Sequence, residues 1–164
     1  PEETKTVSIY SLGERDALVW GNNKYLILAP TIFLKKGTTS ENLSTELLNH
    51  RLTLYYLSAE GDEDANTLKL YLRYEISGIG ESSTEETDDK ESWASDYNVQ
   101  YTNVSYVNLQ PIISMYKSTH SGSEPEKVTV EYEYNNSASS IPTIAKKQTK
   151  TVTYSLYTET SSNN

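Results

Sequence analysis

The clearest pattern in the chain is a strict alternation of apolar and polar residues over positions 67–78. The apolar positions are Leu68, Leu70, Leu72, Tyr74 and Ile76, and between them lie Lys69, Tyr71, Arg73 and Glu75. Successive side chains of a β-strand point to opposite faces, whereas a helix would spread these apolar residues around its circumference. We therefore predict the central strand of an antiparallel sheet, with one face on a core.

Shorter alternations recur along the chain and predict further strands. These candidate strands occupy residues 5–12, 17–20, 25–29, 31–36, 52–57, 97–106, 127–134 and 149–157. Residues 21–24, with the sequence Gly-Asn-Asn-Lys, are typical of a hairpin turn because Gly and Asn tolerate positive φ. The apolar positions change parity between Tyr101 and Val104, which predicts either a bulge near Asn103 or two separate strands. Pro111 interrupts the strand pattern before residues 112–116.

Helical spacing is found in one segment, residues 39–52, where Leu43, Leu47 and Leu48 recur with Ser40 as a candidate cap. Many short strands with at most one short helix near residues 40–50 predict an all-β fold. We expect an antiparallel β-sandwich, of jelly-roll or immunoglobulin-like type. All 164 residues are predicted to form a single domain, with a long polar loop at 78–96 and an extended polar tail at 158–164.

Composition and charge narrow the classes of function. The net charge of −9 disfavours phosphate-rich ligands, so we predict that the chain does not bind nucleic acid. No run of apolar residues approaches the roughly 18 needed for a membrane span, so no membrane insertion is expected. The absence of cysteine excludes disulfides and thiolate chemistry.

Catalytic groups are sparse. His50 and His120 are the only histidines, neither lies in a recognisable motif, and we expect both at the surface. Glu131 and Glu133 share a strand face and are the nearest candidates for the acid pair of a glycosidase. They alternate with Val and Tyr as residues of a solvated strand face normally do. We predict that the protein is not an enzyme.

An acidic turn gives a candidate calcium site. Asp62, Asp64 and Asn66 place oxygen ligands at alternate positions, as the start of a calcium-binding loop does. The EF-hand pattern then fails, because Thr67 stands where Gly is needed and Arg73 where the bidentate Glu should be. Calcium binding outside the EF-hand type and a solvated hairpin tip are the two interpretations, and no other cofactor is predicted.

Aromatic residues give a candidate contact site. The chain has fourteen Tyr against two Trp and one Phe, and Trp93 is the one large aromatic residue in the polar loop. With Tyr97 and Tyr101, Trp93 could form a stacking platform for a sugar or a groove for a partner. The alternative is that Trp93 anchors the loop onto the sandwich.

These observations favour a non-enzymatic structural protein that acts as a subunit of a larger assembly, with other protein subunits as its partners. The all-β pattern without catalytic sets favours a virus or phage particle, in which the chain would be an auxiliary capsid or tail component of the virion. The alternative is a carbohydrate-binding β-sandwich module of an extracellular or cell-surface system.

Overall fold

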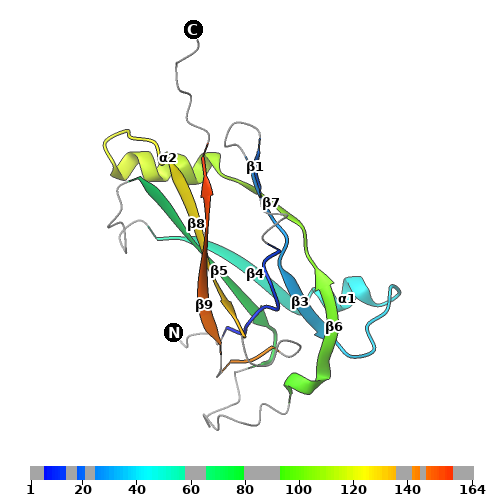
Figure 1. The fold of residues 1–164 in the computed structure, drawn as a ribbon. Helices are drawn as coiled ribbons and strands as arrows, with labels where there is room; N and C mark the ends of the chain where they lie inside the picture. Colours follow the sequence, from blue (N-terminus) through cyan, green and yellow to red (C-terminus); the bar gives the residue numbers. More distant parts are fainter. Residues whose placement is uncertain are drawn as a thin grey trace.

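The structure, a computed structural model, describes residues 6–13, 18–20, 25–57, 66–79, 93–135, 142–144 and 147–156. In chain order the elements are β1 (Leu18–Trp20), β2 (Tyr25–Leu28), β3 (Thr31–Lys35), α1 (Leu43–Leu47), β4 (His50–Tyr56), β5 (Thr67–Ile76), the 3-10 helix η2 (Ala94–Asp96), β6 (Tyr97–Thr102), β7 (Ser105–Asn108), α2 (Gln110–Thr119), β8 (Lys127–Tyr134) and β9 (Gln148–Ser155). Strands dominate and form a sandwich-like arrangement (Figure 1), which confirms the predicted all-β fold class.

The larger layer is a four-stranded sheet in the order β4-β5-β8-β9. β5 pairs antiparallel with β4, and β8 pairs antiparallel with β9, but β5 and β8 run parallel. The sequence predicted a purely antiparallel sheet, and the parallel pairing of β5 with β8 contradicts that prediction. Between β5 and β8 the chain passes through β6, β7 and α2 (Figure 1), and such a long crossover is what a parallel pair requires.

The second layer consists of two sheets, β1-β2-β7 and β3-β6. The pairs Leu28–Ser105 and Thr31–Thr102 belong to one antiparallel register, which Pro30 interrupts because it has no N–H to donate. The ladder is held across this break by the Asn103 backbone N–H, which donates to the Pro30 carbonyl over 2.9 Å.

The alternation of half-buried and exposed residues continues without a break from β6 into β7. Every second residue from Tyr97 to Val107 is half-buried, and the residues between them are exposed. The predicted bulge near Asn103 is therefore wrong, and the alternative of two strands is correct. Val104 and Tyr106 consequently point away from the core, although both are large and apolar.

The core lies between the two layers. The β5 residues Leu68, Leu70, Leu72, Tyr74 and Ile76 are all buried, as their alternation predicts. The second layer contributes Leu26, Leu28, Ile32 and Leu34. Full burial of a Leu or Ile side chain stabilises the fold by about 1.5–3 kcal/mol, so these alternating residues supply most of the driving force for packing the layers.

Residues 6–12 join the two layers instead of forming the predicted strand. Val7 bridges to Tyr74 of β5, Ile9 bridges to Tyr134 of β8, and Ser11 bridges to Thr31 of β3. Each bridge is isolated, because the segment leaves one strand after a single contact and continues to the next.

The helices differ from the prediction in length and number. α1 is shorter than the expected helix, and its N-cap is Asn42, not Ser40; the Asn42 Oδ1 accepts a hydrogen bond from the Thr39 N–H over 2.7 Å. α2 is an additional helix, and it lies at the end of the four-stranded sheet where β5 and β8 begin (Figure 1). Pro111 stands in its first turn, where a missing N–H has no cost.

Parts of the predicted domain organisation fall outside the described residues. Residues 80–92 of the polar loop and the tail at 158–164 are among them, so the single-domain organisation with these two segments stays a prediction. Among the helices of the described residues, none has the length and apolar character of a membrane-spanning helix.

Candidate functional site

The predicted contact residues Trp93, Tyr97 and Tyr101 are half-buried and pack against the core. The rings of Trp93 and Tyr97 meet edge to face, with centroids 6.1 Å apart and planes at 71°. A flat sugar platform needs rings in one plane, so this pair does not supply one. The geometry matches the alternative in which Trp93 anchors the chain onto the sandwich, and a ligand role for the three residues stays a prediction.

Glu46, His50 and Tyr74 form a polar cluster next to Tyr97. The His50 side chain is only 1% exposed, which corrects its expected place at the surface. Its Nδ1 lies 2.6 Å from the Tyr74 hydroxyl oxygen, and its Nε2 lies 2.7 Å from Glu46 Oε2. The His50 ring also packs edge to face on Tyr97.

Further hydrogen bonds connect this cluster to β3. The Tyr74 hydroxyl donates to the Phe33 carbonyl over 3.1 Å and also lies within hydrogen-bond distance of His50 Nδ1. Glu46 Oε2 is an acceptor for the Lys35 backbone N–H at 3.0 Å and for His50 Nε2. The His50 ring therefore bridges Tyr74 and Glu46, with one ring nitrogen facing each of them.

Burial and hydrogen bonding shift the pKa values of two groups in this cluster. Burial, together with the nearby Tyr97 and Glu46, raises the pKa of Tyr74 well above its usual value, so the hydroxyl keeps its proton. Burial also raises the pKa of Glu46, but hydrogen bonds from His50 and the Lys35 backbone outweigh that effect and the pKa lies below 4.5. The contacts of Glu46 with the Lys35 backbone and of His50 with Tyr74 join α1, β3, β4 and β5, and the side chains of His50 and Tyr74 are almost fully buried.

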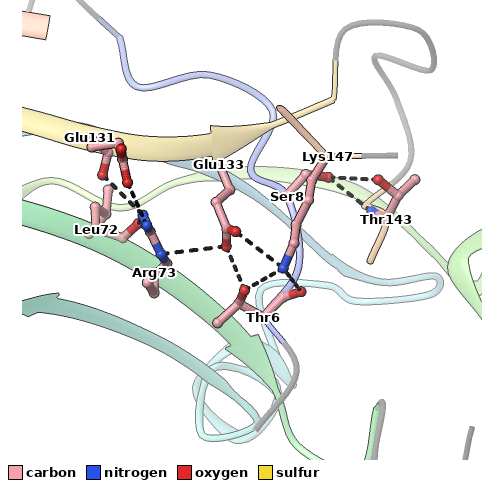
Figure 2. A network of polar contacts seen from close by, with 8 residues as sticks. All are labelled: Thr6, Ser8, Leu72, Arg73, Glu131, Glu133, Thr143 and Lys147. Atoms are coloured by element: carbon pink, nitrogen blue, oxygen red, sulfur yellow. Dashed lines mark hydrogen bonds and ion pairs between the residues drawn. The ribbon is translucent and has the colours of Figure 1, made fainter. Parts of the chain in front are cut away.

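The candidate acid pair Glu131 and Glu133 belongs to a second polar network, on the outer face of the four-stranded sheet (Figure 2). Arg73 Nη2 lies 2.6 Å from Glu131 Oε2, and Arg73 Nε lies 3.8 Å from Glu133 Oε1. Lys147 Nζ lies 3.1 Å from Glu133 Oε2 and donates to the Thr6 carbonyl over 3.0 Å. Each carboxylate therefore has a cationic partner from this chain, and the pair serves to connect β5, β8 and the segment before β9.

His120 also has a structural contact. Its ring stacks on Tyr116 at a centroid distance of 3.8 Å, and its Nδ1 donates to the Tyr116 carbonyl over 2.7 Å. This arrangement closes the C-terminal end of α2, where Ser121 takes a positive φ of 56°.

The calcium hypothesis falls largely outside the described residues, which do not include Asp62 and Asp64. Asn66 stands just before β5, and its carbonyl accepts the backbone N–H groups of Glu126 and Lys127. Within the described part of the chain, no three His, Asp or Glu side chains are grouped as a metal site would need. Calcium binding stays a prediction.

Sequence reasoning missed an exposed surface on the outer face of the second layer. We call it the outer stripe and define it as Tyr10, Ile27, Thr31, Thr102, Val104 and Tyr106. Tyr106 is 67% exposed and Val104 is 53% exposed. The unbroken alternation from Tyr97 to Asn108 was the signal that could have placed these two residues on this face.

Comparisons with known proteins give a likeness of fold. No protein-family model and no curated protein matches the chain. A solved structure described as a candidate lipoprotein of Bacteroides fragilis superposes with a TM-score of 0.71 at 18% identity, over 97% of this chain and 66% of that chain. An uncharacterized protein of Parabacteroides merdae gives a TM-score of 0.36 at 14% identity, over 96% of this chain and 64% of that chain. The chain thus spans slightly less than two thirds of each of these proteins, and the first likeness shows the fold alone.

Proposed function

We propose that this chain is a non-enzymatic interaction protein that acts as a subunit of a larger assembly at the cell surface. The observation that carries this proposal is the state of the candidate catalytic groups. Glu131 and Glu133 are paired with Arg73 and Lys147, and both histidines are engaged in internal contacts. Groups tied up in this way hold a fold together and do not present an acid, base or nucleophile to a substrate.

Exposed apolar side chains support the interaction part of the proposal. Leu48 is 84% exposed at the end of α1, and Met115 on α2 and Tyr55 on β4 are also exposed. Single exposed apolar residues are common on soluble proteins, but Tyr and Met are enriched at the centres of protein interfaces. Other protein subunits are therefore the partners we propose.

The cellular place of the assembly is proposed from the fold. A candidate lipoprotein shares this fold over nearly the whole chain, and lipoproteins are held at membrane surfaces. This favours a cell-surface or extracellular assembly over the virus or phage particle, which remains the alternative and has only the all-β pattern in its support.

The test is to isolate the tagged full-length protein from cells of its source and to measure the mass of the particle that contains it. We expect a mass several times that of one chain, and we expect protease added to intact cells to remove the tag while a cytoplasmic marker survives. If the protein instead sedimented with released virus particles, the assembly would be the virion and not a cell-surface particle. A monomer protected from protease in intact cells would contradict both.

Leu48→Ser provides a matched variant for the same measurement. Because Leu48 is exposed, this change should leave the melting temperature of the isolated chain within about 2 °C of the original, as is usual for surface substitutions. A smaller particle mass with an unchanged melting temperature would place Leu48 at a subunit contact.

A further inference from the structure

The outer stripe runs along one face of the second layer and is separate from the core. Ile27 of β2 lies opposite Tyr106 of β7, and Thr31 of β3 lies opposite Thr102 of β6. At the β3 end, the exposed Tyr10 ring packs edge to face on Phe33 at 5.7 Å. The stripe thus has an exposed aromatic ring at each end, with Val104 and two threonines between them.

Charge is absent from the outer stripe, although the whole chain has a net charge of −9. The neighbouring positions Tyr25, Gln100 and Asn108 on the same face are also uncharged, and the first charged residue along β3 is the exposed Lys35, two positions beyond Phe33. A surface without charge offers no ion pair to a basic or acidic ligand, and it does not repel an uncharged one. The ligand that suits it is neutral.

The groups on the outer stripe combine apolar rings with hydroxyls. Tyr106 and Tyr10 offer ring faces on which a ligand can stack, and their hydroxyls can form hydrogen bonds at the ring edge. The hydroxyls of Thr31 and Thr102 lie 2.9 Å apart and add donors and acceptors midway along the stripe. This mixture matches a sugar chain, whose rings have apolar C–H faces and hydroxyl edges.

The size of the outer stripe argues against a protein partner. From the Ile27–Tyr106 pair to the Tyr10 ring, which packs on Phe33, it extends over about 20 Å, and two paired strands give a width of about 10 Å. The area is then about 200 Å², far below the roughly 800 Å² per partner that a stable protein interface needs. A second copy of the chain would have too little surface here, whereas an oligosaccharide of a few residues fits the length.

We propose that the outer stripe binds a neutral glycan, with Tyr106 and Tyr10 as stacking residues. This goes beyond the proposed assembly role and moves the sugar site away from Trp93, whose ring plane is inclined by 71° to that of Tyr97. The site is open and flat, so binding is expected along an extended chain, not at a single terminal sugar.

Affinity electrophoresis of the folded chain tests this proposal, in native gels that contain a soluble glucan, mannan, galactan or xylan, with polygalacturonate as the acidic comparison. We expect at least one neutral polysaccharide to retard the protein. Tyr106→Ala should weaken the apparent affinity roughly tenfold, the loss expected when a stacked ring is removed, while Tyr106→Phe should retain most of it. Tyr55→Ala is the matched control, because Tyr55 is an exposed tyrosine on the four-stranded sheet.

Three outcomes would overturn the glycan proposal. They are the absence of retardation by all four neutral polysaccharides, retardation by polygalacturonate alone, and retardation that Tyr106→Ala leaves unchanged. Light scattering supplies a fourth, namely a dimer that Tyr106→Ala converts to a monomer, which would make the outer stripe an interface between copies. Failure here leaves the particle mass and protease results untouched, so the two proposals fail separately.

Discussion

The polar groups on the two faces of β5 differ in their exposure to water. On the inner face, Tyr74 is buried and completes a closed set of hydrogen bonds with His50 and the Phe33 carbonyl. On the outer face, the Arg73 side chain is 21% exposed and holds Glu131 in an ion pair. Water can replace a lost partner on the outer face but not on the inner one, so the same loss of a bond should cost more inside.

The difference also explains what each network connects. The inner cluster joins α1, β3, β4 and β5 through hydrogen bonds. These bonds matter because a buried polar group without a partner destabilises the folded state. The outer network joins β5 and β8 to Lys147 through charges that remain partly solvated. The first network should fix the geometry of the fold, and the second should add a modest, salt-sensitive contribution.

The largest expected effect comes from the apolar residues that separate the two networks. Leu70→Ala should lower the free energy of unfolding by about 2–5 kcal/mol, because it leaves a cavity in the core. Lys69→Ala, one position away on the outer face, should lower it by less than about 1 kcal/mol. Urea denaturation of both variants measures the contrast, and equal effects would contradict the assigned faces of β5.

Tyr74→Phe should come next, with a loss of about 1–3 kcal/mol. The change preserves the ring but removes the hydroxyl that contacts His50 Nδ1 and the Phe33 carbonyl inside the core. Tyr71→Phe makes the same change on the outer face and should cost less than about 0.5 kcal/mol. If the two substitutions destabilised the protein equally, burial would not be the cause.

Arg73→Met should have a smaller effect, about 1 kcal/mol, since water can solvate Glu131 and Glu133 once the guanidinium is removed. The difference between the original chain and this variant should shrink in high salt, because screening weakens partly exposed ion pairs. Denaturation at low and high ionic strength checks this. A loss that is independent of salt would indicate that Arg73 acts through packing.

The smallest effect is expected from acid, through Glu46. Its pKa in the folded chain is lowered below 4.5, so the carboxylate stabilises the fold above that pH, and this contribution disappears as the pH falls through the folded pKa. Other carboxylates titrate in the same range, so the comparison is with Glu46→Gln. The original chain should lose stability more steeply than this variant below pH 4.5, and identical profiles would remove Glu46 from the inner cluster.

The sequence of α2 contains a helical pattern that the interpretation of Pro111 as a strand interruption outweighed. Leu109, Ile112, Ile113 and Tyr116 have helical spacing, and all four pack in or against the core. Pro111 suggested an interruption of a strand, although a proline in the first turn also suits the start of a helix. The choice between these two interpretations depends on where the preceding strand ends, and β7 ends at Asn108.

The amino-acid sequence by itself determined the strands with strict alternation. β5 and β8 were predicted within two residues of their observed ends, and the antiparallel pairing of β1 with β2 was expected from the Gly-Asn sequence between them. These features are local, because the two-residue period of a strand and the backbone preferences of Gly and Asn act within a few residues. The core face of β5 was determined in the same way.

The tertiary structure alone decided the contacts between distant segments. The parallel pairing of β5 with β8 places Arg73 beside Glu131, 58 residues away, and the packing of α1 against β3 and β4 places Glu46 and His50 around Tyr74. The alternation of residues within a strand does not specify which strand pairs with it or in which register. Pairing and register follow from the path of the connecting chain and from the burial that the whole fold achieves. For that reason His50 looked like a surface residue in the sequence and has a buried side chain in the fold.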